Sequence, residues 1–209
     1  MLYTFEHFGV AVGAISGVLA AAGKRIDLFG VSVLALVAAL GGGTMRDLVL
    51  RTPPVFWIHD VNYVVTGLVT AVVMFVIARR WVMPALMLLV ADAFVLALFT
   101  TIGAGKALAC GAGNLNAVLL GVMTGVAGGI LRDVLVGEIP LVFRPGIYLY
   151  ATAATFGAVA FVLLEAWRPH ASQNLIIATL VTLGLRLGSI RWRITLPIFK
   201  HRPDADPKS

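Results

Sequence analysis

Long stretches without a charged side chain are the feature that most constrains what this chain can fold into. Four of them reach or approach the about 20 residues that an α-helix needs to cross about 30 Å of hydrocarbon. They are Leu28–Met45, Val61–Ala78, Ala107–Leu131 and Pro145–Leu164. Only 12% of the 209 residues are charged, against roughly 25% in soluble domains. The sequence therefore predicts an all-α integral membrane protein.

Three further segments are apolar apart from one or two polar or charged residues: Leu2–Gly23, Trp81–Gly105 and Ser172–Ile190. With them we expect seven transmembrane helices in a single domain over residues 1–192, followed by a basic cytoplasmic tail over 194–209. A signal peptide would begin with basic residues. Here the first basic residues follow the first segment, so we expect that helix to be retained.

The basic residues predict the orientation, because Lys and Arg collect in cytoplasmic loops. Ten of them follow the first, third and fifth helices or lie in the tail: Lys24, Arg25, Arg79, Arg80, Arg144, Arg191, Arg193, Lys200, Arg202 and Lys208. Only Arg51, Lys106 and Arg168 lie on the other side. We therefore expect a bacterial inner membrane protein with its N-terminus outside and its C-terminus in the cytoplasm. The net charge of +6 then reflects topology and contact with membrane lipids rather than nucleic-acid binding.

The stretch "GGGTMRDLVLRTPP" (41–54) is echoed 86 residues later by "AGGILRDVLVGEIP" (127–140). The same shift places Glu6 on Asp92 and Phe8 on Phe94. We infer one three-helix repeat over about 5–80 and a second over about 91–166, with the seventh helix (about 172–190) outside both. Because three is odd, the second repeat enters the membrane from the opposite face, an arrangement typical of transporters and some channels.

Adjacent glycines mark the second and fifth helices. They are Gly41, Gly42, Gly43, Gly128 and Gly129. Each lowers helix propensity by about 1 kcal/mol relative to alanine, and kinks concentrate at such positions. Two kinked or broken helices at matching repeat positions point to a binding or permeation site. The alternative is that the glycines only let helices pack closely.

Each glycine group precedes an Arg-Asp pair, Arg46–Asp47 and Arg132–Asp133. A charge at the bilayer centre costs about 3 kcal/mol on insertion scales. Neighbouring residues on a helix do not face each other, so the repeat favours cross-pairing of Arg46 with Asp133 and of Arg132 with Asp47. The four residues would then form one set in one region. The alternatives are structural ion pairs or positions near the headgroups.

Four other polar residues are candidates for a path through the membrane. Asp92 lies in the middle of an apolar segment, where acids are functional candidates. Asn116 and Thr124 share a ridge with the second glycine motif, although such residues also bond between helices. Lys106 either influences a cation path or is an ordinary loop lysine.

The sequence offers no chemistry for an enzyme. It lacks a His/Cys metal cluster, a Ser–His–Asp set and a P-loop, and its single cysteine, Cys110, excludes an internal disulfide. We therefore expect no cofactor and no resident metal.

The segments "GGGTMRDLVL" and "GAGNLNAVLLGVMTGVAGGILRDVL" resemble the bacterial branch of the trimeric intracellular cation (TRIC) channels, a domain also catalogued as a glycine transporter. The resemblance covers about residues 5–192. It implies homotrimers with a pore in every subunit, kinks at the glycines of the second and fifth helices, and conduction of monovalent cations, chiefly potassium. The Lys-Glu-Val motif of the animal members is absent at 41–44, so their gating and calcium regulation are not implied.

The function expected is a potassium-permeable channel, with sodium as the second ion. A secondary transporter for a small amino acid such as glycine is the alternative, because inverted repeats with broken helices serve transporters too. A third possibility is a membrane protein whose glycines serve only packing.

The unequal distribution of Lys and Arg between the two sides of the membrane predicts an orientation that can be tested. In a Cys110→Ser background, Ser209→Cys should resist impermeant thiol reagents in intact cells, because it follows the basic tail, while Ser172→Cys should react. The opposite labelling pattern would reverse the topology.

Overall fold

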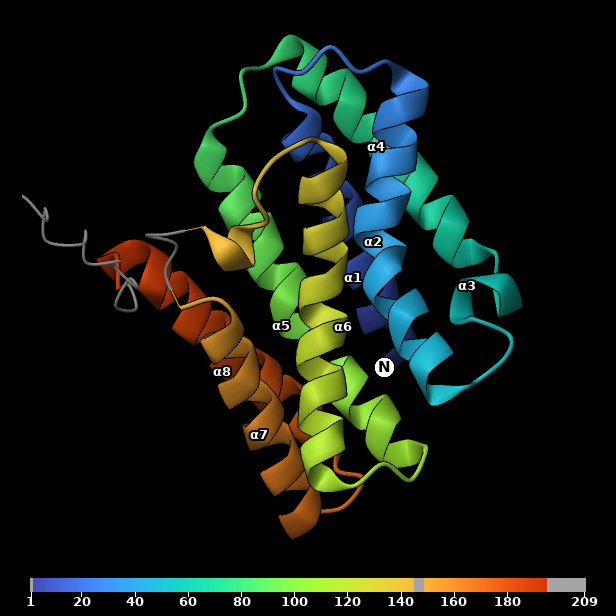
Figure 1. The fold of residues 1–209 in the computed structure, drawn as a ribbon, viewed down its shortest axis with the longest axis vertical. Helices are drawn as coiled ribbons and strands as arrows, with labels where there is room; N and C mark the ends of the chain where they lie inside the picture. Colours follow the sequence, from blue (N-terminus) through green and yellow to red (C-terminus); the bar gives the residue numbers. More distant parts are fainter. Residues whose placement is uncertain (1, 145–148, 195–209) are drawn as a thin grey trace, which may run out of the picture.

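The computed structural model describes residues 2–144 and 149–194, and this part of the chain is helical. Seven long helices alternate in direction (Figure 1). They are α1 (Leu2–Ala21), α2 (Leu28–Leu50), α4 (Asn62–Arg80), α5 (Ala85–Ala109), α6 (Asn114–Leu135), α7 (Ala151–Trp167) and α8 (Ser172–Trp192). Two short elements, α3 (Phe56–His59) and the 3-10 helix η1 (Leu141–Phe143), follow α2 and α6. The expected tail lies almost wholly outside the described residues.

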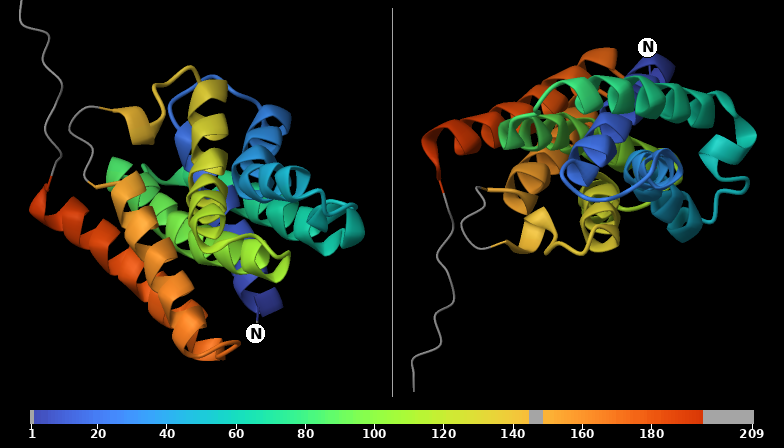
Figure 2. Two further views of the ribbon diagram at one scale, coloured as in Figure 1. Left: turned by 60° about the horizontal axis from the view of Figure 1, so that its bottom comes forward. Right: turned by 90° about the horizontal axis from the view of Figure 1, so that it is seen from above.

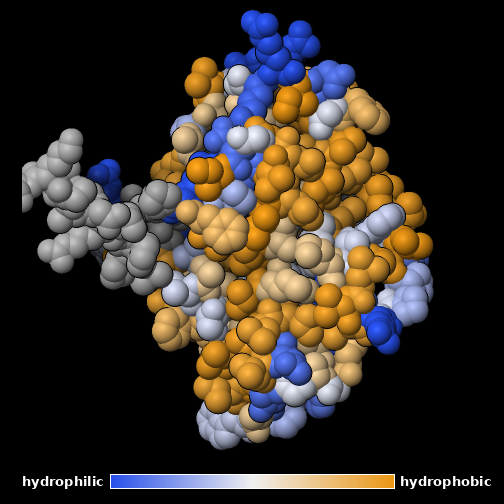
Figure 3. All heavy atoms as spheres, in the orientation of Figure 1, coloured by the Kyte–Doolittle hydropathy of each residue, from blue (hydrophilic) through white to orange (hydrophobic). Residues whose placement is uncertain are grey.

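The long helices have the length and apolar character of membrane-spanning segments. Six of them have 19 to 25 residues and are apolar enough to span it, whereas α7, with 17, is shorter. Apolar side chains cover most of the face seen in Figure 3, and hydrophilic ones gather towards its two ends. The prediction of an all-α, multi-pass membrane protein is confirmed.

The two halves of the chain are built alike around an antiparallel pair, α2 and α6. Helix α1 packs on α2 as α5 packs on α6, and α1 and α5 contact each other. Helix α4 lies against α1 and α2, and α7 against α5 and α6, while α8 covers α5 and α7 (Figure 2). The C-terminal ends of α2 and α6 therefore lie at opposite ends of the bundle (Figure 1).

The glycines do not interrupt their helices. Helix α2 is continuous through residues 41–43 and α6 through 128–129, so neither helix is broken there, and the kinks stay a prediction. The glycines instead permit a close approach between helices. A Cβ at Gly42 would collide with the carbonyl oxygen of Thr124, and one at Gly128 with the carbonyl oxygen of Ala38. These two contacts are related by the 86-residue shift, and they fix where α2 and α6 cross.

Both helices also end in the same way. The residue after the last turn adopts the left-handed conformation, at Arg51 (φ 52°) and at Gly137 (φ 70°). The next N–H then donates back to the aspartate carbonyl of the motif, Thr52 to Asp47 at 3.0 Å and Glu138 to Asp133 at 2.9 Å. This pattern is that of a Schellman C-cap. It turns the chain back over the motif in both halves.

The helix crossing can be tested with alanine. We expect Gly42→Ala and Gly128→Ala each to lower the thermal midpoint in detergent, because overpacking costs about 1–3 kcal/mol and the obstacle here is backbone. Gly184→Ala is the matched control, since a Cβ there meets nothing within 4 Å. Equal midpoints for all three variants would show that the crossing is not tight.

Candidate functional site

The first Arg-Asp motif folds into a buried unit that we call the Arg46 clamp: Arg46, Asp47 and Phe56. The Nε of Arg46 donates to Oδ1 of Asp47 at 2.8 Å, and its Nη2 lies 2.8 Å from the same oxygen. The other oxygen, Oδ2, accepts the backbone N–H of Phe56 at 3.0 Å. The Phe56 ring lies 5.7 Å from the guanidinium carbon. Asp47 thus ties the end of α2 to the start of α3.

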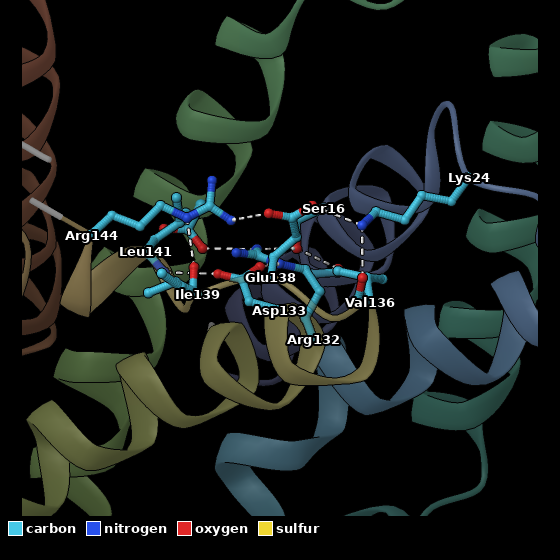
Figure 4. A network of polar contacts seen from close by, with 11 residues as sticks. Ser16, Lys24, Arg132, Asp133, Val136, Glu138, Ile139, Leu141 and Arg144 are labelled. Carbon is cyan, nitrogen blue, oxygen red and sulfur yellow. Dashed lines mark hydrogen bonds and ion pairs between the residues drawn. The ribbon is translucent and has the colours of Figure 1, made fainter.

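The second motif repeats this arrangement as the Arg132 clamp: Arg132, Asp133 and Leu141. Arg132 Nε donates to Asp133 Oδ1 at 2.8 Å, and Asp133 Oδ2 accepts the backbone N–H of Leu141 at 2.8 Å (Figure 4). Here the aspartate ties the end of α6 to η1. Burying charges is tolerated where the remaining polar atoms are hydrogen-bonded, and all four motif residues are at most 2% exposed.

The expected cross-pairing is wrong, because each arginine pairs with the aspartate beside it. Two physical reasons explain the difference. The guanidinium stands on a long stem, so its Nε reaches back to the adjacent carboxylate although the two Cβ atoms diverge. The antiparallel crossing at Gly42 and Gly128 also carries the motifs to opposite ends of the bundle. The four charges therefore form two separate pairs rather than one set.

Asp92 gives Arg132 a second carboxylate. Arg132 Nη1 donates to Asp92 Oδ1 at 2.8 Å and to the hydroxyl of Ser16 at 3.2 Å. Among the described residues, Asp92 Oδ2 and Arg132 Nη2 have no hydrogen-bond partner. A Cβ at Gly129 would lie 3.2 Å from Asp92 Oδ1, 3.2 Å from the hydroxyl of Tyr150 and 3.7 Å from Arg132 Nη2. Glycine at this position leaves room for these polar atoms against the backbone of α6.

Lys106 lies beside the Arg46 clamp. Its Nζ is 3.6 Å from Asp47 Oδ1 and 5.8 Å from the centre of the Phe56 ring. About a third of its side chain is exposed, and it lines a cavity of about 480 Å³ together with Glu6, Asp60 and other residues. Lys106 therefore lies against the carboxylate of Asp47, close to the end of α5.

Thr124 and Asn116 lie apart from the charged clusters. Thr124 is buried at the helix crossing, where its hydroxyl donates to the carbonyl of Leu120 at 2.6 Å within its own helix. Asn116 is exposed in the first turn of α6. The ridge that they share with Gly128 is therefore buried in its middle and open at its start.

Sequence reasoning missed the backbone partners of the two aspartates and a surface latch. The signal for the first was present, since Pro54 and Pro140 recur within the echoed motif and mark the turn before α3 and η1. The latch joins the two halves near the Arg132 clamp (Figure 4). Lys24 Nζ donates to Glu138 Oε1 at 2.8 Å and to the carbonyl of Val136 at 2.7 Å. The hydrogen bond and the positive charge of Lys24 hold the pKa of Glu138 below its usual value.

Residues 2–144 and 149–194 contain no group of three His, Cys, Asp or Glu side chains placed to hold a metal ion. The chemistry available at the two clamps is therefore that of carboxylates, guanidinium groups and hydroxyls in a membrane interior.

Together, the helical fold and the paired clamps define a multi-pass membrane protein of internally duplicated, inverted design. The family described as "Glycine transporter" matches the chain twice, over residues 3–79 and 89–166. This is the spacing of the repeat, and it leaves the seventh helix outside.

Known proteins are similar to this chain over nearly its whole length. The UPF0126 inner membrane protein YadS of Escherichia coli K12 is 45% identical over 209 residues, covering 95% of this chain and 96% of that protein. A UPF0126 membrane protein of Vibrio cholerae is 43% identical over 205 residues, covering 95% and 83%. Among solved structures, the TRIC channel orthologue of Rhodobacter sphaeroides is 38% identical with a TM-score of 0.86, covering 91% of this chain and 97% of that one. A second TRIC cation channel is 32% identical, with a TM-score of 0.84 and coverage of 95% and 97%.

The chain belongs to the TRIC channel family, of which UPF0126 and "Glycine transporter" are the catalogue labels. The predicted family is confirmed, and so is its location as a multi-pass inner membrane protein. The family and its structural neighbours are channels and membrane proteins rather than enzymes.

The two clamps differ in how well each arginine is supported, which gives a prediction. Asp47→Asn should destabilise the protein by about 3 kcal/mol or more, as removing one partner of a buried pair does, because it leaves Arg46 and Lys106 without their carboxylate. Asp133→Asn should cost less, since Arg132 keeps Asp92. Thermal unfolding in detergent measures both.

A double variant completes this test. Asp47→Asn with Arg46→Gln should recover part of the loss, because the orphaned buried charge is removed. The Asp133→Asn and Arg46→Gln pair is the control, and its effects should add because the two residues lie at opposite ends of the bundle. A larger loss for Asp133→Asn than for Asp47→Asn would contradict the assigned pairing.

Proposed function

We propose that this protein is a monovalent cation channel, permeable to potassium, with a path inside each subunit that passes the α2–α6 crossing. The observation that carries the proposal is the antiparallel α2–α6 pair with a buried Arg-Asp clamp at each end, in a fold shared with TRIC cation channels. Charged side chains within transmembrane segments almost always face the bundle interior or a water-filled cavity. The two clamps would then hold the ends of the path open and the helices in register.

The oxygen ligands of the path come from side chains in this proposal. A permeating ion exchanges part of its hydration shell for oxygen atoms. Because the backbone stays helical through Gly43 and Gly129, its carbonyls keep their helical partners. Asp92 is the first candidate, with a buried Oδ2 that accepts no hydrogen bond from the described residues. Lys106 would tune cation entry at the opposite end.

The family also suggests the subunit number, the ions and the orientation that we propose. We propose a homotrimer in which every subunit has its own path, with potassium as the main ion and sodium as a second. The N-terminus would face outside and the C-terminus the cytoplasm, in contact with membrane lipids. The latch of Lys24 and Glu138 would then lie on the cytoplasmic side.

One observation favours glycine transport as a second candidate. Asp92 and Arg132 form an ion pair through Oδ1 and Nη1, and the second carboxylate oxygen of Asp92 and the Nη2 of Arg132 are buried without a hydrogen-bond partner among the described residues. A zwitterion carries one group complementary to each. The family description "Glycine transporter" names the same substrate.

Liposomes containing the purified protein distinguish the two functions. The channel proposal expects a potassium current that exceeds any chloride current, and no saturable exchange of labelled glycine above empty liposomes. Glycine exchange without a potassium current would support the transporter and overturn the channel.

A matched pair of variants tests where the path lies. Gly129→Leu should reduce potassium flux per folded protein, because the new side chain enters the cluster of Asp92 and Arg132. Gly184→Leu should leave flux unchanged, since that glycine is exposed and its Cβ would meet nothing within 4 Å. Normal flux through folded Gly129→Leu protein would move the path away from this cluster.

A further inference from the structure

The cavity beside the Arg46 clamp is lined by aromatic rings as well as by charged side chains. It measures about 480 Å³, within the range of small-molecule sites. We call it the Tyr3 pocket. Its lining includes Tyr3, Glu6, Phe56, Asp60, Tyr63 and Lys106. These residues come from α1, from the connection between α2 and α4, from the start of α4 and from the end of α5.

Three aromatic rings form adjoining walls of the Tyr3 pocket. Tyr63 lies in the middle, with its ring centre 5.9 Å from that of Tyr3 and 4.9 Å from that of Phe56. The planes are inclined by 59° and 71° respectively. The imidazole of His7 adjoins both tyrosines, with its ring centre 4.1 Å from that of Tyr3 and 4.3 Å from that of Tyr63, and it stacks on one face of Tyr63. Such aromatic enclosures recognise quaternary ammonium groups through cation–π attraction.

Each tyrosine holds a carboxylate at the same pocket. The hydroxyl of Tyr63 donates to Glu6 Oε2 at 2.6 Å, and the hydroxyl of Tyr3 donates to Asp60 Oδ2 at 3.0 Å. Neither acid forms an ion pair with a basic side chain of the described residues. The pocket therefore combines aromatic walls with two carboxylates outside any ion pair of the described residues, with Lys106 in the same lining and His7 beside the two tyrosines.

The protein already places one alkylammonium group in this environment. Lys106 Nζ lies near the Phe56 ring and a carboxylate oxygen of Asp47. This is the same pairing of ring and acid that Tyr3, Tyr63, Glu6 and Asp60 offer on the other side of the pocket.

We propose that the Tyr3 pocket binds a small organic cation with a methylated ammonium head. A methylated head is weakly hydrated and suits ring faces, whereas a divalent metal needs several oxygen ligands in close geometry. The described residues offer no such metal-ligand group. The site stands independently of the proposed conduction, because it requires only binding.

Labelled choline is the probe. Protein purified in a maltoside detergent, free of choline lipids, should bind it saturably in a scintillation proximity assay. Tetramethylammonium should compete, while potassium chloride at matched ionic strength should compete far less. The uncharged isostere 3,3-dimethyl-1-butanol should not compete. Absence of saturable binding, or equal competition by the isostere, would overturn the proposal.

Variants assign the binding to the pocket. Tyr3→Leu and Glu6→Gln should each weaken choline binding about fivefold to tenfold, from the loss of a ring or a charge. Phe8→Leu is the control, because Phe8 is an exposed aromatic residue of α1 outside the pocket lining. If Glu6→Gln fails to fold, Asp60→Asn replaces it. Unchanged affinity in folded pocket variants would contradict the site.

The trimethylammonium group has two sources, free solutes and phosphatidylcholine headgroups, and nanodiscs separate them. If phosphatidylcholine discs bind less labelled choline than phosphatidylethanolamine–phosphatidylglycerol discs, lipid headgroups occupy the pocket. If both discs bind equally, the ligand is a free solute. Either result supports the site, and failure of choline to bind in both discs contradicts it. Potassium flux does not enter this readout, so its outcome is separate from that of the channel test.

Discussion

The contact on which the rest of the structure depends is the backbone approach of α2 and α6. Carbonyl oxygens of Thr124 and Ala38 lie where a side chain at Gly42 or Gly128 would begin. Small residues let helix backbones approach in a membrane, where lipid offers no hydrophobic drive for association. Because the two helices are antiparallel, this contact also sets the distance between the two Arg-Asp motifs that they carry.

The clamps follow from that separation. Each Arg-Asp pair lies about one helical turn beyond its glycine, so an antiparallel crossing at the glycines sends the pairs to opposite ends. A buried charge needs a partner, and the adjacent aspartate is within reach of each arginine. The aspartate then has one oxygen left, which accepts the N–H of the turn that follows. The motif is thus a helix-end device, made of a glycine for packing, an ion pair and a capped return of the chain.

Much of this architecture could be predicted from the sequence. The apolar runs locate all seven long helices, and the shift of 86 residues identifies the duplicated motif, because hydropathy and repetition are properties of the chain itself. The partners could not be predicted in the same way. Helix geometry says that Arg46 and Asp47 diverge at Cβ, but a flexible arginine stem overrides it. The contact between Arg132 and Asp92 joins residues 40 positions apart, and only the packing of α5 against α6 brings them together.

The repeat also explains why the two ends of the bundle differ. Duplication supplies Glu6 and Asp92 at equivalent positions, but their surroundings have diverged. Asp92 is buried and neutralises Arg132, whereas Glu6 binds Tyr63 at an open cavity and leaves Arg46 to Asp47 alone. A duplicated scaffold can therefore keep the same helix-end device twice while one acid becomes part of a closed charge cluster and the other part of an accessible pocket. This divergence gives an otherwise symmetric fold two chemically distinct ends.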